Sequence, residues 1–176
     1  MKSEKALLRK YEDDLHVGGI GVIIMGVWSI VKVLIEIFTN TKEFFDVESD
    51  DPVEKALTII VILVFIGAVS VIVMYIHLYI GLNAMKAARG LKYKKRFHIV
   101  TIIYTVISIA ALITYKEDLK DIQNIDTTIA SILVDLTTIY ILIVVFISAI
   151  KIKKLKEKLF GEPGQDGSGN ELLVKG

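Results

Sequence analysis

The 176-residue sequence contains no cysteine, which excludes disulfide bonds, thiolate metal sites and cysteine nucleophiles. It also lacks the HExxH, GxSxG and CxxC motifs and any glycine-rich phosphate loop. Its histidines, His16, His77 and His98, do not have the spacing of metal ligands. Because no pair of nucleophile and base can be named, we expect no enzyme activity, no metal and no cofactor.

Proline is also scarce, since Pro52 and Pro163 are the only two and both fall at expected helix boundaries. Hydrophobic residues, in contrast, make up 53% of the chain, and its mean hydropathy is +0.59. This composition is typical of membrane proteins rather than of water-soluble globular domains. The net charge of +1 is uninformative for such a protein, because the position of each charge along the chain matters more than the sum.

The stretch 51–90 predicts one uninterrupted helix. Asp51 can cap this helix and Pro52 suits its first position. Glu54 completes a capping box, and Gly90 supplies the end of the helix. Residues 57–82 are apolar almost throughout, and at about 1.5 Å per residue they are long enough to cross a hydrocarbon core of roughly 30 Å.

Small or polar residues recur at steps of three and four on one face of this helix. In lipid, such a face is expected to meet other helices, because small side chains let backbones approach and polar ones need partners. The residues are Gly67, Ser70, Met74, His77, Gly81, Ala84 and Ala88. A separate glycine cluster, Gly18, Gly19 and Gly21, is expected to provide close-packing or hinge positions at the start of the first span.

The sequence contains four apolar spans, at about 17–39, 57–85, 97–115 and 127–150. Each span has one small or polar face at helical spacing, which favours an antiparallel left-handed bundle. The predicted fold is therefore all-α, an integral membrane four-helix bundle over residues 17–160. Residues 1–16 form an amphipathic segment, either in the membrane interface or as a solvated lead-in to the first span. The glycine-rich polar residues 161–176 are expected to be a disordered tail.

Lysine and arginine residues mark one side of the membrane. The segment before the first span has four, the loop after the second span has six and residues 151–160 after the fourth span have five, against two in each of the stretches 40–56 and 116–126. By the positive-inside rule, both termini are cytoplasmic and loops 40–51 and 116–126 lie outside. Neither outer loop is long enough to hold a receptor domain.

Three side chains that are charged at neutral pH, Lys32, Glu36 and Asp135, fall inside predicted spans. A charge facing lipid at mid-membrane costs about 2.5 to 3.5 kcal/mol on insertion scales, so these groups are expected to turn toward one another. Lys32 lies roughly 22 Å from the cytoplasmic edge and Asp135 roughly 12 Å from the outer edge, and these depths nearly coincide in a core of about 30 Å. We therefore expect Lys32 to face Asp135, with Glu36 one turn above Lys32. Ser131 and Thr138 flank Asp135 and can donate hydrogen bonds to it.

This cluster has two interpretations. It can be a structural ion-pair cluster that holds the first and fourth spans together. It can also be a cation or proton site open to the outside, with Asp135 and Glu36 as exchangeable acids and Lys32 as an internal counter-charge. The sequence lacks the inverted repeats and broken helices that mark many transporter sites, which argues against the second interpretation.

Two further groups of polar residues are candidate sites. His77, Ser70 and Asn83 belong to the polar side of the second span, where a histidine is most often hydrogen-bonded to a neighbouring helix. A basic patch on the cytoplasmic side can hold anionic lipid head groups or an acidic partner, although the positive-inside rule alone accounts for it. The patch consists of Lys92, Lys94, Lys95, Arg96, Lys151, Lys153 and Lys154. No folded basic module indicates nucleic-acid binding.

In span count and loop length, the sequence resembles small four-span bacterial membrane proteins, some of which act as immunity or accessory factors. Its preference for Lys over Arg and its many Ile residues are typical of AT-rich bacterial genomes. The absence of cysteine pairs argues against tetraspanins and claudins. We expect an accessory, scaffold or immunity-type protein of the cell membrane that binds lipid and a membrane-protein partner or a second copy of itself. The alternative is a small ion- or proton-coupled transporter or channel that uses Lys32, Glu36 and Asp135.

Overall fold

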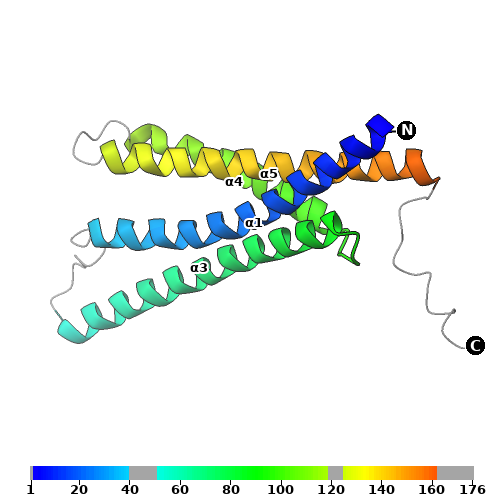
Figure 1. Cartoon of the computed structure of the whole chain (residues 1–176). Coiled ribbons are helices and arrows are strands. Elements are labelled where there is room, and N and C mark those ends of the chain that lie inside the picture. Colours follow the sequence, from blue (N-terminus) through cyan, green and yellow to red (C-terminus); the bar gives the residue numbers. More distant parts are fainter. Residues whose placement is uncertain (1, 40–50, 119–124, 162–176) are drawn as a thin grey trace, which may run out of the picture.

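The computed structural model describes residues 2–39, 51–118 and 125–161. These residues form four α-helices, α1 (Lys2–Thr39), α3 (Pro52–Ala88), α4 (Phe97–Asp118) and α5 (Ile125–Phe160). Successive helices run in opposite directions, so the start of α1 and the end of α5 lie at the same end of the bundle (Figure 1). The predicted all-α four-helix bundle is confirmed, and all four helices are long and apolar enough to cross a membrane. The chain is thus a small polytopic membrane protein.

Two ends of the bundle are distinguished below. The basic end holds the start of α1, segment 89–96 and the end of α5, and the far end holds the opposite ends of the same helices (Figure 1). Most of the loops predicted to lie outside, 40–51 and 116–126, falls outside the described residues, as does the tail 161–176 beyond Gly161.

The boundaries of α3 follow from the capping residues in the sequence. Asp51 is the N-cap, and its side chain accepts a hydrogen bond of 2.9 Å from the backbone N–H of Val53. At the other end, Gly90 adopts a positive φ of 68°. The N–H groups of Gly90 and Leu91 donate to the carbonyls of Ala87 and Lys86, at 3.2 and 2.9 Å, which is the Schellman pattern of a glycine-terminated helix.

Helix packing is concentrated toward the basic end. The contiguous core contains Leu8, Leu15, Val22, Ile80, Ala84, Ala87, Ala88, Phe97, Leu142, Val145, Ala149 and Ile152. In contrast, none of residues 52–76 of α3 and none of residues 102–115 of α4, all of them described, is buried. Helix α1 packs mainly on α3 and α5, and α4 mainly on α5. The predicted closure of the bundle by the first and fourth spans is therefore present.

Glycine allows α1 and α3 to come into backbone contact. A Cβ added to Gly81 would lie 2.5 Å from the carbonyl oxygen of Gly19, and one added to Gly19 would lie 2.8 Å from that of Gly81. A Cβ added to Gly26 would lie 2.6 Å from the Cβ of His77, so the close approach continues along both helices. Only a hydrogen atom fits at these positions, and the backbones touch because no side chain intervenes.

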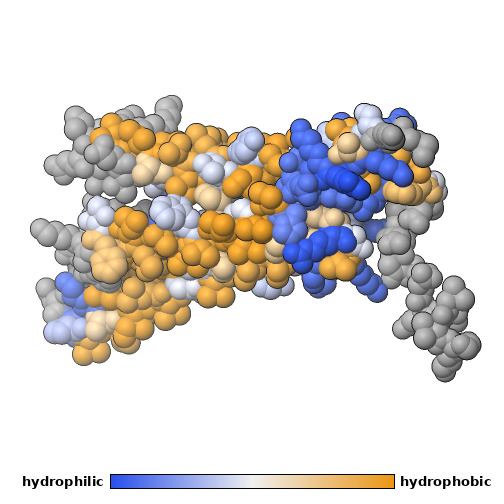
Figure 2. Space-filling model, in the orientation of Figure 1, coloured by the Kyte–Doolittle hydropathy of each residue, from blue (hydrophilic) through white to orange (hydrophobic). Residues whose placement is uncertain are grey.

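Polar contacts fasten the helices together at the basic end. Glu12 of α1 pairs with Lys156 of α5 at 3.0 Å, and Glu4 pairs with Lys158 at 2.6 Å. Residues 2–16 form the first turns of α1 and lead without a break into the first span. Figure 2 shows the resulting surface, which is hydrophilic toward the basic end and predominantly apolar along the rest of the bundle.

Candidate functional site

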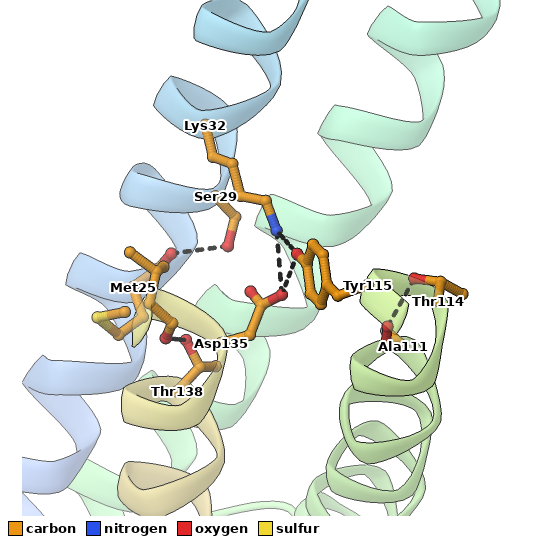
Figure 3. Close-up of polar contacts among 9 residues, drawn as sticks. Met25, Ser29, Lys32, Ala111, Thr114, Tyr115, Asp135 and Thr138 are labelled. Atoms are coloured by element: carbon orange, nitrogen blue, oxygen red, sulfur yellow. Dashed lines mark hydrogen bonds and ion pairs between the residues drawn. The ribbon is translucent and has the colours of Figure 1, made fainter. Parts of the chain in front are cut away.

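A charged cluster joins three helices in the far half of the bundle. The Lys32 ammonium of α1 donates to the Asp135 carboxylate of α5 at 3.0 Å. Tyr115 of α4 donates its hydroxyl hydrogen to the same carboxylate oxygen at 2.6 Å. Lys32 also donates to the Tyr115 hydroxyl, and its Nζ lies 5.0 Å from the centre of the Tyr115 ring. The three side chains point toward one another from separate helices (Figure 3).

The depth of this cluster follows from the length of α4. The candidate span Phe97–Tyr115 has 19 residues, so Tyr115 stands roughly 27 Å from Phe97 along the helix. In a hydrocarbon core of about 30 Å, the cluster therefore lies near the far boundary rather than at the membrane centre. Tyrosine is favoured at this depth, because its ring is apolar and its hydroxyl is polar.

The geometry satisfies each member of the cluster. A tyrosine hydroxyl can donate one hydrogen bond and accept others, and Tyr115 does both here. The ammonium of Lys32 and the carboxylate of Asp135 neutralise each other, so neither is an isolated charge in the apolar layer. The side chains of Lys32 and Asp135 remain 23% and 22% exposed. The arrangement can therefore fix the register of α1, α4 and α5, and it is not sealed.

The structure brings together Lys32 and Asp135, as the depth comparison predicted. The hydroxyl donor to Asp135 is different from the ones expected, because Thr138 donates instead to the carbonyl of Val134 in its own helix at 2.9 Å. The described side chains of Ser131 and Asp135 share no hydrogen bond. The side chain of Glu36 lies outside the described residues.

Tyr115 is the member that sequence reasoning missed as a site residue. The sequence did contain a signal for it, because Tyr115 shares a helical face with Thr101, Tyr104 and Ser108. Counting residues from the start of the third span places Tyr115 roughly 27 Å from the basic boundary, closer to the far end than the depths counted for Lys32 and Asp135, so depth alone does not identify it.

The polar side of α3 divides into separate local contacts. His77 is fully buried, and its Nδ1 lies 2.8 Å from the carbonyl oxygen of Val73 in the same helix. Its Nε2 lies 3.4 Å from the hydroxyl of Tyr104 on α4, so the contact with the neighbouring helix is a long one. Ser70 is only partly buried and lies in the part of α3, described throughout, that has no buried residue.

Asn83 has a structural task at the basic end. Its amide nitrogen donates to the carbonyl of Tyr79 at 2.7 Å, and its amide oxygen accepts from the backbone N–H of Lys94 at 2.9 Å. Asn83 therefore ties segment 89–96 to α3. Arg89 is held beside α1, where its Nη2 lies 2.8 Å from the Nε2 of His16.

All seven residues of the predicted basic patch are exposed: Lys92, Lys94, Lys95, Arg96, Lys151, Lys153 and Lys154. Lys153 lies 3.9 Å from Glu157, one helical turn further along α5. Tyr93, between Lys92 and Lys94 in the sequence, is partly buried against the core beside Phe97, and burial raises the pKa of its hydroxyl. The charge of the patch near neutral pH is thus carried by its lysine and arginine residues.

Within the described ranges, no group of three or more His, Asp or Glu side chains could hold a metal ion. Comparisons of the chain with models of protein families, with curated proteins and with solved structures find no match. The geometry of the chain itself therefore carries the functional proposal.

Proposed function

We propose that this protein is an accessory or scaffold component of the membrane, which binds another transmembrane helix along residues 52–76 of α3. The observation that carries the proposal is a contrast within α3. None of these described residues is buried, whereas seven residues from His77 to Ala88 are. An immunity-type role is one form of such binding, and the proposal assigns no enzyme activity to the chain.

The composition of this surface supports a helix as the occupant. Gly67 has no atom within 4 Å of the position that a Cβ would take. Glycine inside a helix costs about 1 kcal/mol relative to alanine, and no contact with the described part of the chain offsets this cost. Gly67 and Ser70 are small and lie three residues apart on one face, and small residues in such a pattern let a second helix approach closely. The second helix would belong to another membrane protein or to a second copy of this chain.

The charged cluster leaves this surface accessible. Lys32, Tyr115 and Asp135 connect α1, α4 and α5 toward the far end without a residue of α3. Helix α3 is held toward the basic end, where Gly81 meets Gly19. A partner could therefore pack along residues 52–76 without displacing contacts within the described bundle.

Spin labels on single cysteines test this proposal, and the native chain has no cysteine to remove. Gly67→Cys and Ser70→Cys place the label on the small-residue face. Phe65→Cys and Ile72→Cys are matched controls on the opposite face, where both native residues are exposed. We expect labels at the first pair to be less mobile in native membranes than in detergent-purified monomer, and labels at the second pair to be equally mobile in both. Equal mobility at all four positions in native membranes would contradict the proposal.

We further propose that the basic end faces the cytoplasm. The positive-inside rule supports this orientation, because the basic end carries the clusters of lysine and arginine. Lys92→Cys should then be protected from a membrane-impermeant thiol reagent in intact cells and react after permeabilisation. Labelling of this cysteine in intact cells would show that the basic end faces the outside and would contradict the proposed orientation.

The alternative function is ion or proton exchange at the charged cluster. The observation that favours it is the partial exposure of Lys32 and Asp135, together with a position near the far membrane boundary. Against it, the Lys32 ammonium already occupies the position that a cation would take beside Asp135. Flux in liposomes separates the two roles. Asp135→Asn should abolish a pH-dependent flux if the cluster is an exchange site, and should change only stability if it is structural.

A further inference from the structure

Five cations at the basic end form a group that we call the cation belt: Lys92, Lys94 and Arg96 of segment 89–96, and Lys151 and Lys154 of α5. All five are exposed, and none forms an ion pair with a described residue. The ammonium of Lys94 lies 6.0 Å from the centre of the Tyr79 ring. The surface of the basic end is hydrophilic where it borders the apolar surface of the bundle (Figure 2).

The backbone that carries the first three cations is held in place. The Schellman pattern at Gly90 fixes its start, and Asn83 accepts a hydrogen bond from the backbone N–H of Lys94. The side chain of Phe97 is fully buried directly after Arg96. The spacing of Lys92, Lys94 and Arg96 is therefore set before any ligand arrives, which lowers the entropy cost of binding.

The cation belt lies at the depth of lipid head groups. Arg96 immediately precedes the candidate span Phe97–Tyr115. On α5, Lys151 directly follows an apolar run that ends at Ile150. Phe97, which follows Arg96, and Ile152, which follows Lys151, are buried in the same core cluster, so the two parts of the belt are neighbours. Long lysine and arginine side chains at such a boundary extend toward phosphate groups while their stems stay in the apolar layer.

The belt has few carboxylates available in the sequence around it. Residues 55–116 contain no Asp or Glu, so segment 89–96 has no acid near it in the sequence. The cations at the start of α1 are different, because Glu4 and Glu12 lie among them. Anions from outside the chain would relieve the repulsion among the belt residues.

We propose that the cation belt binds the phosphate groups of anionic phospholipids, in the leaflet on that side of the membrane. The lipid phosphates lie at the same depth as the cations and surround the bundle, which suits residues spread over two elements. The cation belt lies at the opposite end of the molecule from the helix-binding surface on α3, so lipid binding at the belt is independent of a partner helix on that surface.

Lipid binding by the purified protein in detergent tests the belt, because detergent has no inside or outside and membrane orientation cannot contribute. Native mass spectrometry would follow titration with phosphatidylglycerol or phosphatidylcholine. The test variant is Lys92→Gln/Lys94→Gln/Arg96→Gln, in which the backbone contact with Asn83 is retained. The matched control is Lys5→Gln/Arg9→Gln/Lys10→Gln. It also removes two lysines and one arginine, but from exposed positions further from the apolar span.

The native protein should prefer phosphatidylglycerol, and the preference should weaken as salt rises. The test variant should lose at least tenfold in affinity, since each cation near a charged membrane surface contributes about fivefold. The control should stay within about twofold of the native protein. Equal losses in the two variants, or no loss in the test variant at an unchanged thermal midpoint, would overturn the proposal. Free inorganic phosphate that competes fully with the lipid at equal concentration would also overturn it, because the site would then select phosphate rather than lipid.

Discussion

The two halves of α3 have the same helical periodicity but different surroundings. Residues 77–88 pack against α1, where the carbonyl oxygen of Gly19 lies against Gly81 and that of Gly81 lies against Gly19. None of the described residues 52–76 is buried, and no atom of the described chain lies within 4 Å of the position that a Cβ on Gly67 would take. A small-residue face therefore gives a helix the ability to pack closely, whereas a complementary glycine on the opposing helix determines where packing occurs.

The largest expected effect is at Gly81, in the half of α3 that packs against α1. Gly81→Leu would drive a side chain into the Gly19 carbonyl, and we expect a loss of about 3 kcal/mol in the free energy of unfolding or failure to fold. Gly81→Ala is the milder test, with an expected loss of about 1 to 3 kcal/mol. Unfolding in mixed detergent micelles measures both.

Gly67→Ala is the matched control for this comparison. It should leave stability unchanged or raise it by up to about 1 kcal/mol, because alanine is the better helix former and nothing within 4 Å obstructs it. Equal destabilisation at positions 67 and 81 would show that both halves of α3 are packed.

The next effect concerns the cluster that joins the other three helices. Lys32→Met leaves the Asp135 carboxylate without its cation, and we expect a loss on the order of 2 to 3 kcal/mol in the free energy of unfolding. The double variant Lys32→Met/Asp135→Leu should recover part of this loss, since it leaves no unpaired charge. A double variant as unstable as the sum of both single ones would argue against direct coupling.

Tyr115→Phe tests the same charged cluster with a smaller change. It removes a hydroxyl that bonds to both Lys32 and Asp135 but keeps the ring. We expect a loss of about 1 to 2 kcal/mol, typical of a hydrogen bond to a charged group. Thr137→Val on the exposed side of α5 serves as the control and should change stability by less than about 0.5 kcal/mol.

The smallest expected effect lies at the basic end. Glu12→Gln weakens the ion pair with Lys156, whose members are 28% and 35% exposed. Partly exposed pairs of this kind contribute about 0.2 to 1 kcal/mol, and we expect a loss in that range that shrinks at high salt. A larger loss that is independent of salt would mean that Glu12 contributes through packing rather than charge.

The sequence predicted the helices and the Lys32–Asp135 pair because both depend on simple geometry. Helical rise is nearly constant, so two residues on facing helices can be compared by depth. The cap at Asp51 and the stop at Gly90 were equally predictable, because each depends on a local backbone requirement.

Other features depended on information that local pattern does not contain. Thr138 was expected to donate to Asp135, but a threonine hydroxyl inside a helix can reach a carbonyl one turn earlier, and it donates to Val134. The donor is Tyr115, and whether it reaches Asp135 depends on how α4 is oriented about its own axis. The unpacked half of α3 was not predicted either, because periodicity along one helix does not reveal whether a neighbour diverges.

The length of α4 has a consequence for the choice of membrane. Its candidate span has only 19 residues, about 28 Å at helical rise, between the cations of segment 89–96 and Tyr115. The neighbouring helices are much longer and can tilt to suit a thinner layer, but α4 cannot stretch to suit a thicker one. In a thick, sterol-rich bilayer the lipid would have to compress around α4, so this protein should partition into thinner regions of a mixed membrane.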